Sequence, residues 1–383
     1  MEYDWESQQP YAYWLECVKG LGRKSRWELV EAAGSPRAAY EMTGKEWRMI
    51  LSEKKAEALE RAREAGGAES AEERYRQFCK GEIRYIPHMH PDYPERLKKI
   101  PDPPFGIFLW GKLPEEREPA VAIIGARECS EYGRYVAEKA AMELAEKGIG
   151  IISGMARGID GISQWAALRA GGNTYAVLGC GVDICYPPGN RGLYEELKKR
   201  GGVLSEYLPG TSPQAGLFPM RNRIISGLSD LVLIVEAREK SGTLITADMA
   251  LEQGKEVYAV PGRVTDSLSS GCNRLIKQGA GMAASIEEML EESGILKVPA
   301  ETEKRERVGN RESPKRRQES KGKEEQAGIF RYLDFYPKCV EQLQKESGME
   351  YRQMICELME LCMENKAEQV SAGQYLKKRD TQG

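Results

Sequence analysis

The stretch Ala-Val-Ala-Ile-Ile-Gly, residues 120–125, decides the fold of this 383-residue chain. Its consecutive apolar residues indicate a strand that is buried on both faces, and the glycine marks a turn at the end of that strand. Ser130-Glu-Tyr-Gly133 then opens a stretch of helical composition that runs to Lys147 with an alanine-rich face. A buried strand followed directly by a helix is the repeating unit of a parallel α/β sheet.

The same alternation of apolar run and helical segment recurs along the chain. Further apolar runs lie at residues 149–153, 174–179, 203–207, 231–235 and 257–261. Strands and helices in this order predict an α/β fold with a Rossmann-like, doubly wound, mostly parallel sheet, which we assign to residues 120–298. Such sheets bind ligands at the carboxyl ends of their strands, so we expect a functional site in the loops at that edge.

The residues before this core predict a small helical domain and a connector. Residues 1–80 carry apolar positions at helical spacing, with turns at 20–22 and 34–36. The turn Gly20-Leu-Gly22 leaves two interpretations open, an ordinary helix connector or a helix-hairpin-helix turn that offers backbone N–H groups to a phosphate. Residues 81–119 are rich in proline and predict an extended connector to the core.

The residues after the core predict a linker and a third domain. Residues 299–326 are charged and hold almost no large apolar side chains, which is typical of a flexible linker. Residues 327–383 regain helical periodicity on both sides of Ser347-Gly348 and end in a predicted hairpin at 368–376. A winged-helix domain and a three-helix protein-interaction module both fit this pattern.

Composition narrows the classes of function. The 56 lysines and arginines nearly balance the 59 acids, so a site for a polyanion must be built locally. The nine cysteines include no Cys-x-x-Cys pair and the N-terminus has no leader pattern, which predicts a reduced, cytoplasmic protein. No apolar run reaches the roughly 18 residues of a membrane span. His88 and His90 are the only histidines, so we expect neither a metal site nor a histidine-based triad.

The loops at the carboxyl ends of the predicted strands share glycines, hydroxyls and arginines. A glycine allows close backbone approach, the free N–H groups of a helix start attract an anion, and an arginine adds a permanent charge. Together these loops predict a site for a phosphate-bearing ligand. Its candidate residues are Gly125 and Arg127 after the first strand, Ser153, Gly154 and Arg157 after the second, Tyr186 and Asn190 after the third, Phe218, Arg221, Asn222 and Arg223 before the fifth, and Ser241 and Gly242 after it.

Several motifs are absent from the sequence. There is no Gly-x-x-x-x-Gly-Lys-Ser/Thr, and Gly179-Cys-Gly181 is followed by Ile184 where a dinucleotide fingerprint has its third glycine. ATP and NAD therefore lose support, and we expect no cofactor. The loops also lack paired carboxylates and a Cys/His arrangement, which favours binding over catalysis, with no catalytic residue to assign.

The motifs in these loops resemble those of the DNA-processing protein A (DprA/Smf) family. The resemblance spans about residues 120–290 and includes the segments 125–133, 153–160, 179–190, 218–225, 241–246 and 259–262. It implies a single-stranded-DNA-binding protein, not an enzyme, that forms a homodimer through its core, protects incoming DNA during natural transformation and helps load the RecA recombinase. The family's Gly-x-Arg motif implies Arg127 in the DNA groove, with residues 218–223 beside it.

Two positions depart from the family pattern. Ala126 stands where the family usually has serine, and Ser163-Gln164 stands where Ala-His is common. The residues themselves agree with the resemblance, because non-specific binding of a single strand requires cations along the backbone and aromatic faces for the bases. We expect Phe218 and Tyr186 to supply those faces.

The segment 218–230 carries two arginines, for which we expect different roles. Arg223, next to an apolar run, is expected to hold the loop by an ion pair while Arg221 meets DNA. Ile224, Ile225 and Leu228 are expected to anchor the helix in the core.

Two other functions compete with single-strand binding. One is a Rossmann-like nucleoside-monophosphate phosphoribohydrolase, a class that follows a Gly-Gly-x-Gly-Thr loop with catalytic glutamates. Here Gly242-Thr-Leu244 is followed by Ile245 and Thr246, which cannot replace a carboxylate. The other is a nucleotide-sensing adaptor, which would bind a mononucleotide tightly and oligonucleotides weakly.

Overall fold

A computed structural model describes residues 4–65, 70–295, 328–364, 366–371 and 373–378. The chain divides into two compact units, Met1–Lys297 and Val298–Gly383. The predicted linker at 299–326 lies outside the described residues. Among the described helices, none combines the length and the apolar character of a membrane span.

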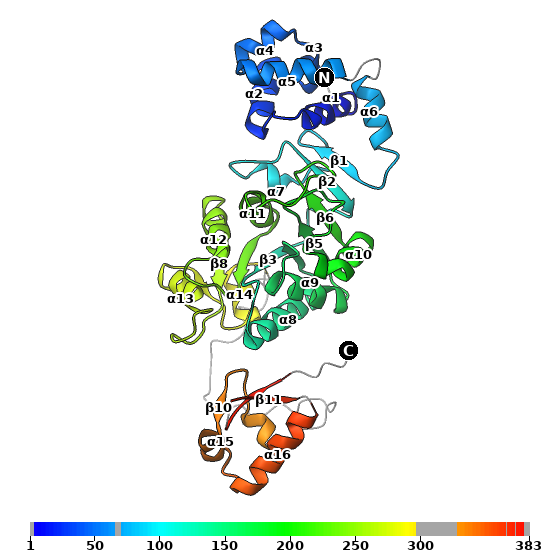
Figure 1. Ribbon diagram of the computed structural model, residues 1–383. Coiled ribbons are helices and arrows are strands. Elements are labelled where there is room, and N and C mark those ends of the chain that lie inside the picture. Colours follow the sequence, from blue (N-terminus) through cyan, green and yellow to red (C-terminus); the bar gives the residue numbers. More distant parts are fainter. Residues whose placement is uncertain (1–3, 66–69, 296–327, 365, 372, 379–383) are drawn as a thin grey trace, which may run out of the picture. The chain divides into compact units, whose positions relative to one another are not determined.

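Helices occupy the N-terminal part of the first unit (Figure 1). They are α1 (Trp5–Cys17), α2 (Arg23–Ala33), α3 (Pro36–Glu41), α4 (Gly44–Ile50), α5 (Glu53–Ala65) and α6 (Ala71–Phe78). The predicted turns at 20–22 and 34–36 separate the first three helices, and Gly20 and Gly34 both have positive φ angles, near 88° and 84°. Glycine adopts this conformation without the steric cost that a side chain would add.

The centre of the first unit is a nine-stranded sheet with the order β1-β2-β6-β5-β4-β3-β7-β8-β9. Its strands are β1 (Arg84–Pro87), β2 (Gly106–Gly111), β3 (Ala120–Ile124), β4 (Gly150–Ser153), β5 (Thr174–Val177), β6 (Gly202–Ser205), β7 (Leu231–Ile234), β8 (Glu256–Ala259) and β9 (Gly281–Met282). The pairs from β6 to β9 are all parallel. The six strands expected from the apolar runs are confirmed as β3 to β8.

Helices cover both faces of this sheet, as the doubly wound fold predicts. The connecting helices are α8 (Glu131–Glu146), α9 (Ile159–Arg169), α10 (Arg191–Arg200), α11 (Leu217–Leu228), α12 (Gly242–Glu252), α13 (Ser270–Lys277) and α14 (Ile286–Glu292). Val121 and Ile123 of β3 belong to a core cluster with residues of α8, α9 and α14. Ala122 and Ile124 belong to the opposite cluster with residues of α11 and α12. Alternate side chains of β3 thus belong to the two hydrophobic cores on opposite faces of the sheet.

The strand order reverses at β3 and β7, which lie side by side in the sheet. From β3 the chain continues through β4 and β5 to β6 on one side, and from β7 through β8 to β9 on the other. Adjacent strands whose connections leave in opposite directions open a crevice at their carboxyl ends. The topology therefore places a crevice after Ile124 and Ile234.

The expectation of a connector at 81–119 is incomplete, because this segment contributes two strands to the sheet. β1 pairs antiparallel with β2, and β2 pairs antiparallel with β6. A short helix, α7 (Glu95–Lys98), lies between them. The prolines that suggested a connector lie at the end of β1 and in the loop before β2, positions where proline removes no hydrogen bond from a central strand.

The second unit contains two helices and a small sheet. Its elements are the 3-10 helix η2 (Ile329–Tyr332), β10 (Lys338–Cys339), α15 (Val340–Ser347), α16 (Tyr351–Met363), β11 (Ala367–Ser371) and β12 (Gln374–Lys377). Gly348, with φ near 67°, ends α15, and the predicted hairpin forms between β11 and β12. Two helices joined by a tight turn and followed by a hairpin are the elements of the winged-helix alternative.

Candidate nucleic-acid interface

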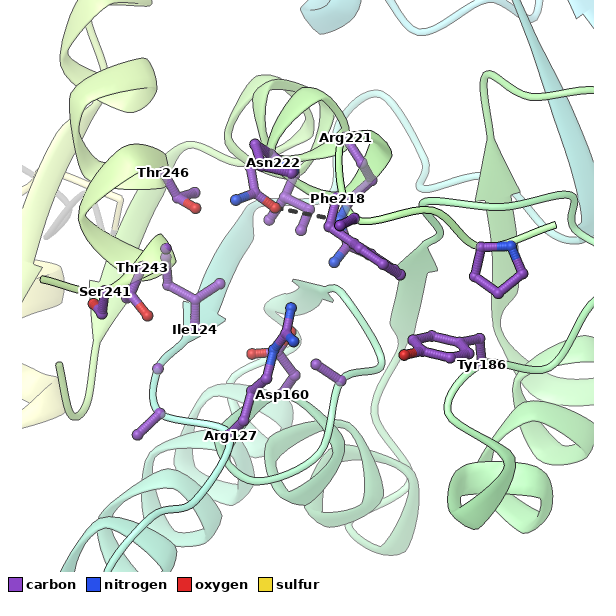
Figure 2. Close-up of a pocket in the computed structure, with 18 residues that line it drawn as sticks. Ile124, Arg127, Asp160, Tyr186, Phe218, Arg221, Asn222, Ser241, Thr243 and Thr246 are labelled. Carbon is purple, nitrogen blue, oxygen red and sulfur yellow. Dashed lines mark hydrogen bonds between the residues drawn. The ribbon is translucent and has the colours of Figure 1, made fainter. Parts of the chain in front are cut away.

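A hollow of about 570 Å³ opens at the carboxyl ends of β3 and β7. We call it the main hollow. Its walls come from the β3–α8 loop, the start of α9, the β5–α10 loop, the first turns of α11 and the start of α12 (Figure 2). The hollow thus coincides with the crevice that the strand order creates. Eight of the residues predicted from sequence line it, namely Gly125, Arg127, Tyr186, Phe218, Arg221, Asn222, Ser241 and Gly242.

Arg127 provides the accessible positive charge of the main hollow. Its side chain is exposed, and Figure 2 shows it rising from the β3–α8 loop toward Asn222 and Phe218. Its guanidinium carbon lies 5.7 Å from the centre of the Phe218 ring. Within the described part of the chain it forms no ion pair, although it attracts the buried carboxyl group of Asp160 and so favours a lower pKa there. An exposed permanent charge that is not held in an ion pair is available to an anion.

Two aromatic rings lie beside this arginine. The Tyr186 and Phe218 rings are stacked, with centroids 5.3 Å apart and planes 29° apart. Tyr186 is 39% exposed, so one aromatic surface faces solvent. A side chain at Gly179 would lie 2.7 Å from the Phe218 ring, so this glycine allows Phe218 its position. The rings therefore offer a fixed apolar face to a planar ligand.

The start of α12 adds a second group for an anion. Ser241 occupies the N-cap position but makes no capping hydrogen bond. Its Oγ is buried at the wall of the main hollow and has no hydrogen-bond partner among the described residues. The N–H groups of a helix's first turn have no intrahelical acceptor and carry partial positive charge. Ser241 and the backbone after it can thus donate hydrogen bonds to a phosphate.

Arg221 lies at the wall of the main hollow, but its guanidinium binds backbone carbonyl groups of the protein. The residue is only 5% exposed, and its Nη1 donates to the carbonyl oxygens of Gly154, at 2.9 Å, and Val177. The buried carboxyl group of Asp160 lies nearby and accepts from the Gly154 amide. Burial raises the pKa of Asp160 and lowers the pKa of Arg221, and the attraction between the two opposes both shifts. These contacts support a structural role for Arg221, and the expectation that it meets DNA directly stays a prediction.

Arg223 lies outside the main hollow and holds the helix in place. It is 4% exposed and forms ion pairs with Asp102 and Glu206, which Arg23 of α2 also contacts. The expected ion pair of Arg223 is confirmed, and its predicted DNA contact has no support in this position. Ile224, Ile225 and Leu228 are buried in the core as expected. Arg23, the first residue of α2 after the turn considered as a phosphate-binding hairpin, is likewise paired with acids.

Other predicted residues shape the loops from behind. Ser153 is fully buried and donates to the carbonyl oxygen of Ile123 at 2.7 Å, so it does not reach the hollow. Asn190 donates from Nδ2 to the carbonyl oxygens of Met155, at 2.9 Å, and Ala156, at 3.1 Å. Gly154 is required, because a Cβ there would lie 2.5 Å from Arg221. The structure brings neither Ser153 nor Asn190 into the main hollow.

Gln164, at a position where the family commonly has histidine, is fully buried. Its Oε1 accepts from the Met155 amide at 3.1 Å, and its Nε2 donates to Thr174 at 3.3 Å. Met155 has a positive φ of 52°, which costs a side-chain-bearing residue energy and persists where the surroundings hold it. Gln164 is thus part of the loop's support.

Sequence reasoning missed some residues of the main hollow. Asp160, Thr243 and Thr246 line it but were not among the candidates. Thr243 follows Ser241-Gly242, so extending that motif by one residue would have found it. Asp160 is the one carboxylate among the described residues of the wall, which also hold no histidine and no cysteine.

Comparisons with known proteins agree with this architecture. The family described as DNA recombination-mediator protein A matches residues 84–294. The DNA processing protein DprA of Streptococcus pneumoniae is 44% identical over 200 residues, 52% of this chain and 71% of that protein. Its Bacillus subtilis counterpart is 44% identical over 211 residues, 55% of this chain and 71% of that protein. The X-ray structure of the S. pneumoniae protein aligns with a TM-score of 0.66 and 33% identity, covering 74% of this chain and 97% of that one.

Proposed function

The chain belongs to the DNA recombination-mediator protein A family, and on this premise we propose that it binds single-stranded DNA in the main hollow. The observation that carries the proposal is Arg127, exposed and without an ion partner among the described residues, beside the stacked rings of Tyr186 and Phe218. A cation that holds the backbone next to a face that accepts any base is the combination that sequence-independent binding requires. Ser241 and the start of α12 supply a site for a second phosphate.

A mobility-shift assay with labelled oligo-dT tests this proposal. Arg127→Ala removes a cation that binds a phosphate, so we expect about a tenfold loss of affinity, since hydrogen bonds to charged groups contribute about 1.5–3 kcal/mol. The slope of log affinity against log salt should fall by about 0.7 for each phosphate of a single strand that the protein no longer neutralises. Duplex DNA serves as the comparison ligand.

Arg117→Ala is the matched control for this variant. Arg117 is exposed, has no ion pair within the described residues, and lies before β3, at the opposite end of the strand that leads to Arg127. Both variants change the net charge equally, but only one alters the main hollow. Wild-type affinity in Arg127→Ala, or an equal loss in Arg117→Ala, would overturn the proposed site.

We also propose that the protein is not an enzyme. The rival phosphoribohydrolase activity requires a carboxylate at the reacting sugar, and Asp160 in the wall is 7% exposed and faces Arg221. Incubation with nucleoside monophosphates should release no base. Clear turnover would refute this part of the proposal. Tight binding of a mononucleotide with weak binding of oligo-dT would instead favour the nucleotide-sensing adaptor.

The remaining functional proposals rest on family membership. We propose that the protein protects incoming DNA in natural transformation, helps load the RecA recombinase and acts in the cytoplasm as a homodimer. Exposed apolar side chains such as Leu251, 58% exposed, and Met282, 52% exposed, support self-association. Sedimentation analysis tests the dimer, and a RecA strand-exchange assay on DNA coated with a single-strand-binding protein tests the loading activity.

A further inference from the structure

A second hollow, of about 320 Å³, adjoins the main hollow. Arg127 belongs to the walls of both. A smaller recess of about 50 Å³ has Arg127 and Arg157 in its wall together with Tyr186 and Phe218. Because Arg157 also lines the second hollow, the three spaces share walls and follow one another around Arg127. A linear polymer that extends from the main hollow past Arg127 therefore enters the second hollow.

The second hollow is rich in arginine. Arg127, Arg134 of α8 and Arg157 of the β4–α9 loop line it, and Glu128 is the acid among its described lining residues. Arg157 is exposed and has no ion pair within the described part of the chain. Arg134 contacts Glu131 at 3.4 Å, with both side chains about two-fifths exposed. An exposed pair of this kind is weak, so Arg134 can exchange its partner for a phosphate at little cost.

An aromatic side chain lies beside these arginines. Trp165 of α9 is partly exposed, lines the second hollow and has no ring stacked on it among the described residues. A Cβ on Gly192 would lie 3.4 Å from the edge of its indole ring, so the chain at the start of α10 passes close to one edge of it. A partly exposed indole that packs against the core on one side, next to Arg157 and the weakly paired Arg134, repeats the combination of arginine and aromatic ring found at Arg127, Tyr186 and Phe218.

We propose that the second hollow binds the continuation of the single strand held in the main hollow. Arg157 and Arg134 contact the next phosphate, and Trp165 stacks on the next base. This inference rests on the proposed function and extends it. It assigns a path that the strand follows beyond the main hollow, and it assigns DNA contacts to Trp165 and Arg134. It also accounts for Arg157, which lies outside the main hollow.

Oligonucleotides of two lengths test this inference. We use oligo-dT of about 4 and about 16 nucleotides, the range of site sizes in single-strand-binding folds. Trp165→Ala should weaken binding of the long oligonucleotide about fivefold or more, the loss expected from one stacked base, and leave the short one within about twofold. Arg157→Ala should lower the salt slope by about 0.7 for the long oligonucleotide only.

Two further variants separate a DNA contact from a folding effect. Trp165→Phe keeps an aromatic face, so it should bind the long oligonucleotide with most of the affinity that Trp165→Ala loses. It should also lack the part of the tryptophan fluorescence that DNA quenches in the wild type. Arg169→Ala removes an arginine from the same helix that does not line the second hollow, and it should bind as the wild type does.

The outcomes distinguish the two proposals. If Trp165→Ala and Arg157→Ala bind the long oligonucleotide as the wild type does while Arg127→Ala does not, the second hollow is not on the path of the strand. If the short oligonucleotide is weakened as much as the long one, Trp165 does not contact a separate nucleotide and the inference also fails. If the wild type shifts neither oligonucleotide, the proposed function itself is overturned.

Discussion

Replacing Arg221 by methionine asks whether this arginine supports the loops or contacts DNA. Its buried guanidinium donates to the carbonyl oxygens of Gly154 and Val177 and faces the buried carboxyl group of Asp160. Methionine fills a similar space but offers neither a charge nor a strong donor. The variant therefore removes from Asp160 the cation that attracts it most, leaving the weaker attraction of Arg127, and it leaves both carbonyl oxygens without this donor.

The expected cost of this change is large. Arg221 and Asp160 attract each other without a direct ion pair. The expected cost therefore lies at the lower end of the about 3–5 kcal/mol for removing one partner of a buried ion pair, where the remaining charge stays out of water. Burial already raises the pKa of Asp160, so this carboxyl group can take up a proton and relieve part of the cost. We therefore expect about 3 kcal/mol, which at roughly 2–4 °C per kcal/mol lowers the unfolding midpoint by about 6–12 °C.

Thermal unfolding followed by circular dichroism measures this effect. Adding Asp160→Asn to Arg221→Met removes the uncompensated carboxylate, so the double variant should be more stable than Arg221→Met alone. Below its unfolding transition, Arg221→Met should keep the wild-type salt slope for oligo-dT. A different result would show that Arg221 contacts DNA and that the structural role is wrong. In that case Arg221→Met would unfold at the same temperature as the wild type, bind oligo-dT more weakly, and show a slope of log affinity against log salt that is smaller by about 0.7.

Two more substitutions give expected outcomes. Burial raises the pKa of Glu16 from 4.5 to about 7 against the attraction of Arg26. The folded protein therefore binds more protons than the unfolded chain between these values, and stability falls by up to about 3 kcal/mol as the pH rises through them. In denaturant unfolding, the wild type should have a lower free energy of unfolding at about pH 8 than at about pH 5, and Glu16→Gln should remove this difference. The same difference in both proteins would contradict the prediction. Gly158→Ala places a Cβ at a φ of 72° and 2.2 Å from the carbonyl oxygen of Ala126. We expect it to displace the loop that carries Arg127 and to lower both stability and oligo-dT affinity, and wild-type values of both would contradict this.

The parallel core was predictable from the sequence because its signals are local. β3 is buried on both faces, so every one of its residues is apolar and the strand appears as an uninterrupted run. The loops that follow the strands bring their glycines and hydroxyls to one edge because parallel strands all end there. For this reason the sequence predicts one site for Arg127, Tyr186, Phe218 and Ser241, and all four line the main hollow.

The antiparallel edge strands were not predictable in the same way. β1 has only four residues, ends in Pro87 and has its partner strand across a proline-rich loop. Its apolar residues Tyr85 and Ile86 are buried by contacts with distant segments rather than by a pattern of their own. Proline content indicated an extended chain correctly but carried no information on strand pairing.

The roles of the arginines could not be read from the sequence because acids far along the chain decide them. Arg223 is neutralised by Asp102, 121 residues away. Arg221 attracts the buried Asp160 most strongly, and Arg127 forms no ion pair among the described residues. The overall charge is near zero, so affinity for a polyanion must come from arginines that the fold leaves unpaired. Arg127 and Arg157 both meet this condition within the described residues, and they line neighbouring hollows at the carboxyl edge of the sheet, whereas Arg117, which also lacks an ion pair, lies at the opposite end of β3.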